Sequence, residues 1–353
     1  MEIEKKRFEI KYDIAITKLL SELKCVIAIS TYQAGKVIFI GANNNKSLYQ
    51  IPISFKKPMG IALLDNKMAI ATLDEIQIFS ASTSLAKLFP DNPGVYDKLY
   101  VPRATYYCGE TDLHDLGFGN GGLWAINTRF SCISTYDINY SFTPRWKPPF
   151  ITELKPQDRC HLNGMAMIDK TPAFVTALSK TNTPEGWREN ITESGVLMRV
   201  PSGEIILENL PMPHSPRIIN NNLYLLLSAT GEIIKVDIEN KNYEVITKID
   251  GFIRGMTEYK NYLFVGLSKV RKTSKTFSKL PVSEMADYSG IVVIDLVENK
   301  TIGEIKYQTT VEEIFDVQII PNVIKPGLIN GNDNRHKFAV TTPNISFWKN
   351  ENK

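Results

Sequence analysis

The sequence predicts an all-β protein built as a β-propeller of about six blades. Three observations support this fold class: short strand-like segments fill most of the chain, one sequence unit recurs six times, and three of the four histidines recur at intervals of 47 and 53 residues. These intervals are close to the roughly 40–50 residues of a propeller blade. Because equivalent positions on successive blades surround one channel, the spacing also predicts that the histidines meet there.

A short helix is predicted first, over residues 12–24, because apolar residues recur there at helical spacing. After it the pattern changes to short apolar runs separated by turn-forming Gly, Asn and Asp clusters. This pattern is typical of sandwiches, barrels and propellers. The predicted strands include 25–30, 36–41, 48–53, 67–72, 75–80, 122–127, 196–200, 223–228, 232–237, 262–267, 290–295 and 301–306.

The repeated unit favours the propeller among these folds. It consists of a polar or small residue, a Gly or Asp, an apolar run, a turn and a second apolar strand. Small residues at the start of an innermost strand let neighbouring backbones approach around the channel, which explains Gly60, Gly164 and Gly255. The units begin at Met59, His114, Asn163, His214, Arg254 and Phe315.

The two ends of the chain are expected to close the ring. The sixth unit, at Phe315, has no clear second strand after it, whereas residues 25–53 supply three strands without a leading unit. Pairing them in one blade would remove most exposed sheet edge. We therefore predict a single domain over residues 1–353. Seven blades stay open as an alternative, if residues 337–348 form part of another blade.

Composition places the chain among ordinary soluble proteins, with 43% apolar and 22% charged residues in 353. The net charge of +3 comes from 41 basic and 38 acidic residues, so no nucleic-acid partner is expected. The one basic run, at 269–279, is interpreted as a solvated loop, with an anion-binding lip as the alternative.

The N-terminus is charged and lacks the apolar stretch of a signal peptide. No segment approaches the ~18 apolar residues that span a bilayer. We expect a cytoplasmic protein with no membrane partner and with cysteines as free thiols. The four are Cys25, Cys108, Cys132 and Cys160. For Cys108 and Cys160, which lie near histidines, burial in the core is the first interpretation and a role as ligand or nucleophile is the alternative.

The histidines are the candidate metal ligands. Imidazole binds zinc, iron and copper, and three such ligands with an open position can hold a metal that activates water. The sequence therefore predicts a divalent transition metal (Fe, Zn or Cu) at His114, His161 and His214. The alternative is that each is a hydrogen-bonded structural residue. His336 lies in a polar loop and is expected to be exposed.

Other polar residues precede or begin the innermost strands and are expected at the same channel mouth. Asp316 or Asp158 would be the catalytic base, and Arg254 would clamp the substrate as part of the catalytic set. The alternative is that these Asp and Arg residues pair across blades, since buried charges need partners. The predicted substrate-binding residues are Arg217, Asn163, Arg129 and Trp146.

Two long polar loops, 142–160 and 180–192, are expected near the mouth. Long loops in compact domains are often functional. The first carries Trp146 in an aromatic, proline-rich stretch and is a candidate lid, with plain packing against the propeller as the alternative.

Several motifs resemble an uncharacterised bacterial family that is described only as a domain of unknown function. They are STYQAGK (30–36), NTRFSC (127–132), RWKPPFI (145–151), DRCHLNG (158–164), GWREN (186–190), MPHSPR (212–217), GLSKVR (266–271) and EIFDVQ (313–318). The resemblance implies a propeller-like fold and no established reaction. Some members of the family carry tetratricopeptide repeats, which this chain lacks.

A looser likeness is to six-bladed propellers of the gluconolactonase and strictosidine-synthase type. That likeness implies a divalent metal held by Glu, Asn and Asp, for which Asn163 and Asp316 occupy comparable positions. His114 and Arg254 do not fit that pattern, which favours a transition metal over calcium.

Two functions follow as hypotheses. The first is a metal-dependent enzyme that acts on a small polar molecule or a peptide at the channel, by hydrolase or lyase chemistry or, next, by oxidation. The second is a non-catalytic propeller that binds a ligand or a protein partner. Fold class alone does not choose between them.

Overall fold

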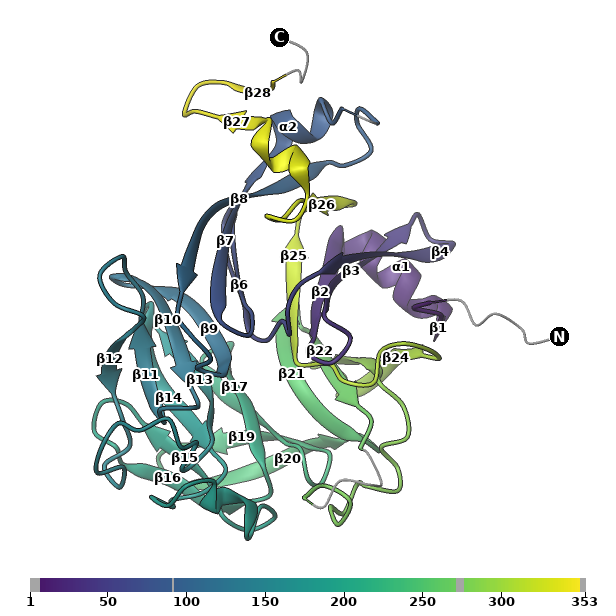
Figure 1. Ribbon diagram of the computed structural model, residues 1–353. Helices are drawn as coiled ribbons and strands as arrows, with labels where there is room; N and C mark the ends of the chain where they lie inside the picture. The colour runs from purple at the N-terminus through teal and green to yellow at the C-terminus, as the bar shows by residue number, and fades with distance from the viewer. Residues whose placement is uncertain (1–6, 91, 271–275, 350–353) are drawn as a thin grey trace, which may run out of the picture.

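A computed structural model describes residues 7–90, 92–270 and 276–349. Six sheets are arranged around a central channel, so the prediction of a six-bladed propeller is confirmed (Figure 1). The innermost strand of each blade packs against that of the next, and the last strand in the ring, β25, also packs against β5. None of the helices in the described part of the chain has the length and apolar character needed to cross a bilayer.

The first, second and sixth blades combine strands from the N-terminal and C-terminal parts of the chain, whereas the third, fourth and fifth are each formed by consecutive strands. The first blade contains β25 (Asp316–Pro321), β2 (Cys25–Thr31), β3 (Lys36–Asn43) and β4 (Ser47–Ser54). The second contains β5 (Ile61–Leu64), β6 (Lys67–Ala71), β7 (Glu75–Ser82), β8 (Lys98–Tyr107) and β26 (Pro326–Leu328). The third contains β9 (Leu113–Gly119), β10 (Gly122–Asn127), β11 (Cys132–Thr135) and β12 (Thr143–Trp146).

The fourth to sixth blades follow in order. The fourth contains β13 (Leu162–Ile168), β14 (Thr171–Ala177), β15 (Gly195–Arg199) and β16 (Ile205–Leu210). The fifth contains β17 (Pro213–Ile219), β18 (Asn222–Leu227), β19 (Glu232–Asp237) and β20 (Asn242–Lys248). The sixth contains β21 (Phe252–Tyr259), β22 (Tyr262–Ser268), β23 (Gly290–Asp295), β24 (Lys300–Tyr307) and β1 (Ile10–Tyr12).

The first blade closes the ring as the sequence predicts. Strand β2 pairs antiparallel with β25, in a register that runs from Cys25 opposite Pro321 to Ser30 opposite Asp316. Two added strands were not predicted: β1 at the edge of the sixth blade, and β26, which lies parallel to β8 in the second.

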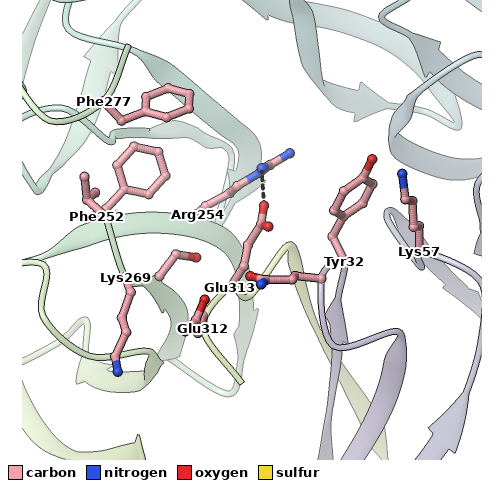
Figure 2. Close-up of a pocket in the computed structure, with 11 residues that line it drawn as sticks. Tyr32, Lys57, Phe252, Arg254, Lys269, Phe277, Glu312 and Glu313 are labelled. Carbon is pink, nitrogen blue, oxygen red and sulfur yellow. Dashed lines mark hydrogen bonds and ion pairs between the residues drawn. The ribbon is translucent and has the colours of Figure 1, made fainter. Parts of the chain in front are cut away.

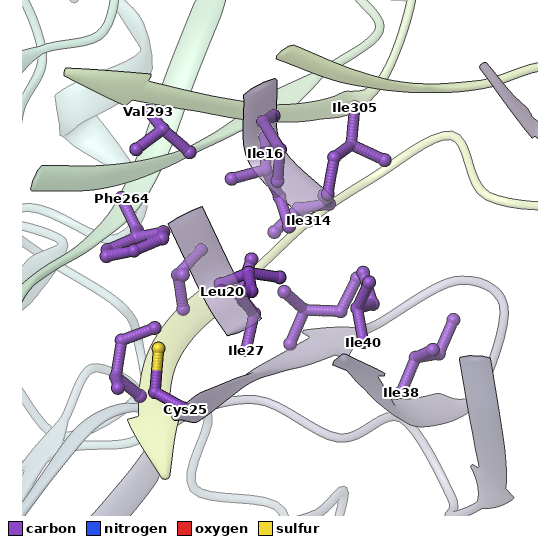
Figure 3. Packing of buried hydrophobic residues seen from close by; sticks show 14 of the residues in the cluster. Ile16, Leu20, Cys25, Ile27, Ile38, Ile40, Phe264, Val293, Ile305 and Ile314 are labelled. Atoms are coloured by element: carbon purple, nitrogen blue, oxygen red, sulfur yellow. The ribbon is translucent and has the colours of Figure 1, made fainter. Parts of the chain in front are cut away.

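The predicted N-terminal helix is present as α1 (Ile14–Leu23). Its buried face, with Ile16 and Leu20, packs between the first and sixth blades (Figure 3). The helix ends at Lys24, which takes a left-handed conformation and donates its backbone N–H to the carbonyl of Leu20. The helix thus covers apolar surface where the two ends of the chain meet.

Residues 337–348 do not build a seventh blade, so that alternative is wrong. Strands β27 (Ala339–Thr341) and β28 (Ser346–Trp348) pair only with each other in a two-stranded sheet. They pack on α2 (Thr83–Lys87), at the top of Figure 1, where Trp348 meets Phe89 with ring centroids 5.7 Å apart. Short 3₁₀ turns occur at Gly186–Arg188 and Asn334–Lys337.

The glycines that begin inner strands occupy close approaches between blades. A Cβ on Gly60 would lie 3.1 Å from the Cα of Asp115, and one on Gly255 would lie 2.8 Å from the Cα of Asp316. A Cβ on Gly164 would overlap the ring of Pro216. The structural interpretation of these glycines is therefore confirmed.

Candidate functional site

The three repeated histidines line one pocket of about 260 Å³ at the channel mouth. His114 lies on β9, His214 lies on β17, and His161 directly precedes β13. The pocket is also lined by Asp158, Arg129 and Arg254 from the predicted set, and by Tyr32, Trp187, Phe252 and Phe315. Both long loops contribute, since Asp158 belongs to 142–160 and Trp187 to 180–192.

His114 is held in one tautomer by its neighbours. Its Nδ1 lies 2.9 Å from the hydroxyl oxygen of Thr128 and 3.2 Å from the backbone carbonyl of Asp112. The Thr128 hydroxyl donates its own proton to the carbonyl of Leu162, 2.5 Å away. Both neighbours of Nδ1 therefore act as acceptors, so Nδ1 carries the proton and Nε2 carries the lone pair.

His214 repeats this arrangement two blades later. Its Nδ1 lies 2.9 Å from the hydroxyl oxygen of Ser228 and 3.1 Å from the carbonyl of Met212. The Ser228 hydroxyl donates to the carbonyl of Ile253 at 2.6 Å. The same reasoning places the proton on Nδ1 and the lone pair on Nε2.

His161 is oriented by a buried carboxylate instead. Its Nδ1 lies 3.0 Å from each oxygen of Asp158, which also accepts the indole N–H of Trp187 at 2.9 Å. The His161 ring contacts Trp187 and His114, with centroids 4.3 and 4.8 Å apart. Asp158 and His161 both have left-handed backbone conformations, with φ of 45° and 51°. Such conformations in non-glycine residues are characteristic of sites where the surroundings impose a geometry.

Two of the histidines are neutral near pH 7. Burial is the main cause that lowers the pKa of His114 and of His214 well below the usual value, and the charges of His161 and Arg254 lower both further. The Nε2 lone pairs of His114 and His214 therefore lie near the positive charge of Arg254, and neither of these two rings is itself charged.

Arg254 lies between the histidines and the outer part of the channel mouth. Its guanidinium stacks on Phe315 at 3.5 Å and donates from Nη1 to Glu313 at 3.3 Å. Its Nη2 is buried and has no hydrogen-bond partner among the residues that the structure describes. Burial lowers the pKa of Arg254 below its usual value. An unpaired buried donor of this kind is unfavourable in the free protein and is available to an acceptor.

Arg129 also lines the pocket, but its guanidinium is paired. It forms an ion pair with Asp112 at 3.2 Å, and both side chains are roughly one-third exposed. It is therefore a weaker candidate anchor than Arg254, whose Nη2 is unpaired.

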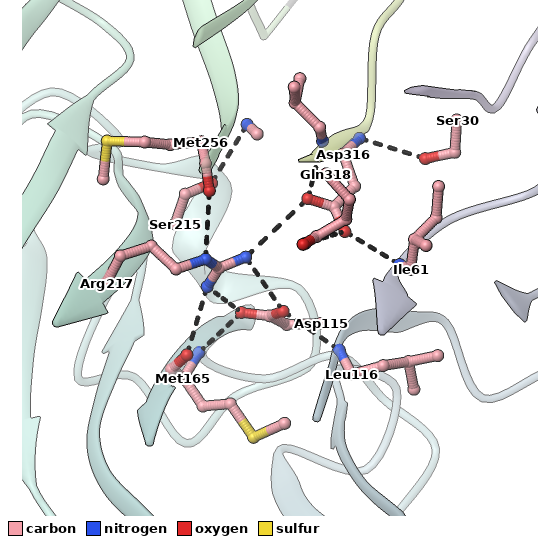
Figure 4. Close-up of polar contacts among 12 residues, drawn as sticks. Ser30, Ile61, Asp115, Leu116, Met165, Ser215, Arg217, Met256, Asp316 and Gln318 are labelled. Atoms are coloured by element: carbon pink, nitrogen blue, oxygen red, sulfur yellow. Dashed lines mark hydrogen bonds and ion pairs between the residues drawn. The ribbon is translucent and has the colours of Figure 1, made fainter. Parts of the chain in front are cut away.

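Arg217 and Asp316 lie in a separate buried network and are not among the residues that line the pocket (Figure 4). Arg217 makes a two-point ion pair with Asp115, at 2.8 and 3.2 Å, and lies 3.8 Å from Asp316. Burial, together with the nearby Asp115, raises the pKa of Asp316 to about 6. The alternative of pairing across blades thus describes the contacts of these two residues.

This network joins all six innermost strands. Arg217 of the fifth blade pairs with Asp115 of the third and donates to the backbone carbonyls of Met165 in the fourth blade and Met256 in the sixth. The carboxylate of Asp115 accepts the backbone N–H of Met165. The carboxylate of Asp316, in the first blade, accepts the backbone N–H of Ile61 in the second. The contacts indicate a structural connection along the axis, and the catalytic role of Asp316 and the substrate contact of Arg217 stay predictions.

Asn163 and Trp146 also lie outside the pocket lining. Asn163 donates to the carbonyl of Pro213 at 3.0 Å, which connects the fourth and fifth blades. Trp146 is on the outer strand β12 and donates to the carbonyl of Pro201 at 2.9 Å. These contacts use the polar groups that the sequence assigned to substrate.

Sequence reasoning missed the hydroxyls that orient two histidines. Thr128 and Ser228 each follow their histidine by 14 residues. This matched separation was a usable signal, because it recurs in two blades. It also missed that Asp158 would contact His161 rather than act alone.

Throughout 7–90, 92–270 and 276–349, no three His, Cys, Asp or Glu side chains gather closely enough to hold a metal ion. The four cysteines are free thiols, as predicted, and all are buried, which was predicted for Cys108 and Cys160. The predicted metal therefore lacks a formed site in this arrangement of side chains, although its three proposed ligands share one pocket.

Comparison with known proteins supports the fold and leaves the reaction open. No curated protein matches the chain at a significant level. Among 417 matching solved chains is one from a crystal structure of a nidogen/laminin complex, with a TM-score of 0.53 and 11% sequence identity over 84% of this chain and 99% of that one. At this identity the likeness shows the propeller fold alone.

A family profile confirms the resemblance of the sequence motifs to a family of unknown function. The profile, described as "Domain of unknown function (DUF4915)", matches residues 14–329, which include all six innermost strands and the whole histidine pocket. The chain belongs to the DUF4915 family.

Proposed function

We propose that the histidine pocket binds a small acidic molecule and acts on it by acid–base chemistry. The observation that carries this proposal is the Asp158–His161 pair, in which Nδ1 lies 3.0 Å from both carboxylate oxygens at the wall of a pocket that also contains Arg254.

His161 is the proposed base. A carboxylate that accepts Nδ1–H fixes the tautomer with its lone pair on Nε2 and stabilises the imidazolium that forms when Nε2 takes a proton. Asp158 is held in place by the indole of Trp187, so it is a positioning residue rather than the base itself. This revises the role that the sequence suggested for Asp158.

Arg254 is the proposed anchor for the acid. Its planar guanidinium suits a carboxylate or phosphate, and charge-assisted hydrogen bonds of this type are stronger than neutral ones. Because Nη2 is buried and unpaired among the described residues, an acidic group that reaches it would satisfy that nitrogen. The aromatic wall of Phe315 and Trp187 limits water there, which strengthens the interaction.

Two reaction types fit this arrangement. In hydrolysis, His161 Nε2 takes a proton from water as the water oxygen attacks, and the imidazolium returns that proton to the leaving group. In an elimination, Nε2 takes a proton from the carbon beside the acidic group, the electrons of that C–H bond form a C=C double bond, and the leaving group on the next carbon departs with the electrons of its own bond. Both are lyase- or hydrolase-type reactions of a small polar substrate.

A metal-dependent enzyme is a second candidate, favoured by one specific observation. All three pocket histidines direct Nδ1–H at an acceptor, which is the support that metal-binding histidines usually have. Zinc, iron or copper at the three Nε2 atoms would require side-chain rotation to bring them together, because the described residues hold no formed three-ligand cluster. A third outcome, binding of the acid without turnover, would make the propeller a ligand-binding module.

Nitrogen NMR of protein labelled with ¹⁵N-histidine tests the tautomers directly. We expect the three pocket histidines to show protonated Nδ1 and unprotonated Nε2 at pH 7.5. If His161 instead carries its proton on Nε2, it has no lone pair there and the proposed base is wrong.

Binding of acetate and inorganic phosphate tests the anchor. We expect Arg254→Gln to weaken binding of at least one of these acids at least tenfold, since a charge-assisted pair is lost. The matched control is Arg199→Gln, whose ion pair with Glu204 is surface-exposed. Equal binding by wild type and Arg254→Gln, or no binding of either acid, would overturn the proposal.

Titration with Co²⁺ separates the metal candidate. Histidine ligands to cobalt produce visible absorption bands, and His214→Gln should remove them if the metal uses all three rings. Absence of cobalt bands in the wild type rejects the metal-dependent form and leaves the acid–base form in place.

A further inference from the structure

We propose that the substrate is an elongated acid with an aromatic or alkyl body. Its acidic group would meet Arg254, and its body would occupy a second, larger cavity that joins the histidine pocket. This inference rests on the proposed function and specifies the class of molecule that the site takes.

The second cavity has a volume of about 690 Å³ and adjoins the first; Figure 2 shows residues that line it. The two share five lining residues: Tyr32, Phe252, Arg254, Phe277 and Glu313. Sites for small organic ligands have volumes of about 300–1,000 Å³. The histidine pocket alone is below that range, whereas the adjoining cavity lies well inside it.

Arg254 stands where the cavities meet. Its Nη1 is paired with Glu313, a residue that lines both spaces, whereas Nη2 is buried without a partner among the described residues. An acid bound at Nη2 therefore lies at the boundary. Because the histidine pocket is small, any body of more than a few atoms would extend into the larger cavity.

The wall next to Arg254 is aromatic. Phe252 contacts Phe277 edge to face, with ring centroids 6.2 Å apart. Phe252 also contacts His214, with ring centroids 6.4 Å apart. Apolar surface thus continues from the histidines outward along the path that the body would follow. Figure 2 shows both phenylalanines on one side of Arg254, with Tyr32 and Lys57 on the other.

The rim adds positive charge at the entrance. Lys57 lies over the ring of Tyr32 at 5.3 Å, and its ammonium forms no ion pair with any carboxylate of the described residues. A cation at the entrance favours the approach of an acid over that of a neutral molecule of the same shape.

The test compares acetate, 3-phenylpropionate and the neutral 3-phenylpropanol by calorimetry or NMR titration. We expect 3-phenylpropionate to bind at least tenfold more tightly than acetate, because its ring leaves water, and at least tenfold more tightly than 3-phenylpropanol, because only the acid pairs with Arg254.

Two variants test whether the tighter binding of 3-phenylpropionate arises in the larger cavity. Phe277→Ala removes part of the aromatic wall, and Gln33→Trp fills the cavity from an exposed position, so the second keeps the test valid if the first unfolds. Each should reduce the advantage of 3-phenylpropionate over acetate to threefold or less. Phe142→Ala is the control and should leave it unchanged, because Phe142, which pairs with Phe130, lines neither cavity.

The outcomes separate this inference from the proposed function. If acetate binds through Arg254 but 3-phenylpropionate binds no more tightly, the elongated substrate is wrong and the acid anchor stands. If the advantage persists in both Phe277→Ala and Gln33→Trp, the body lies elsewhere and the inference is overturned. If none of the acids binds, the proposed function has failed first.

Discussion

Replacing Arg217 with methionine tests whether the axial network stabilises the propeller. Arg217 is the cation within ion-pair distance of two buried carboxylates, Asp115 at 2.8 Å and Asp316 at 3.8 Å, whose side chains are 6% and 3% exposed. Removing one partner of a buried ion pair typically costs about 3–5 kcal/mol, because the remaining charge is left uncompensated. Methionine preserves much of the volume, so the effect reports charge rather than a cavity.

The expected shift in melting temperature follows from the size of the chain. At about 2.1 cal/mol/K per residue, 353 residues give an unfolding entropy of about 0.7 kcal/mol/K. A loss of about 4 kcal/mol therefore lowers the melting temperature by about 5–6 °C, which scanning calorimetry resolves easily.

The matched control is Arg199→Met, because the ion pair of Arg199 with Glu204 is 3.3 Å long and about 40% exposed on both sides. Exposed pairs are worth about 0–1 kcal/mol, so this variant should melt within about 1–2 °C of wild type. A second variant, Arg217→Met with Asp115→Asn, should recover part of the loss by removing one stranded charge. If Arg217→Met melts like the control, the network contributes no net stability and the reasoning is refuted.

Three further predictions concern the rest of the molecule. Burial lowers the pKa of His214, so below about pH 6.5 the unfolded chain takes up a proton that the folded chain does not. As the pH is lowered, the free energy of unfolding should therefore decrease more steeply in wild type than in His214→Gln, by about 1.4 kcal/mol per pH unit. Equal slopes of the two proteins in urea unfolding would contradict this. Gly255→Ala places a Cβ 2.8 Å from the backbone of Asp316 at a φ of 76° and should cost at least about 2 kcal/mol, whereas Gly331→Ala, with open space around it, should change stability by less than about 0.5 kcal/mol. The four buried thiols should be almost unreactive toward a disulfide reagent at pH 8 in the folded protein and should all react in guanidinium; rapid reaction of any one in the native state would show that its burial is wrong.

The sequence predicted the ring because propellers leave periodic signals. The units that begin at His114 and Arg254 each contain a short inner strand and a turn. The unit at Phe315 is incomplete, which predicted that the N-terminal strands complete its blade. The pairing of Ser30 with Asp316 confirms that closure. By contrast, the parallel strand Pro326–Leu328 has only three residues and pairs with β8, more than 200 positions away in the chain. No local pattern predicts such a pairing.

The site was predicted in outline, because residues at the start of inner strands face one channel whatever their chemistry. Their partners were not predictable in the same way. Arg217 and Arg254 both lie on inner strands, yet one pairs with Asp115 and the other stacks on Phe315. Which acid reaches which arginine depends on depth along the axis, and depth is set by β-bulges such as the one between His214 and Arg217. Single-sequence periodicity does not resolve a shift of one or two residues at a bulge.

The contrast between these two arginines is the strongest physical argument for a ligand. Each guanidinium nitrogen of Arg217 has an acceptor, and the contacts reach across the ring. Arg254 lies on the neighbouring blade, beside two neutral histidines, with one buried nitrogen unsatisfied among the described residues. The same fold can therefore supply hydrogen-bond acceptors to every nitrogen of a buried guanidinium, and it does so for Arg217 in the adjacent blade. Local departures from such satisfaction are expected where a structure serves binding or catalysis rather than stability, and here the departure coincides with the oriented Asp158–His161 pair.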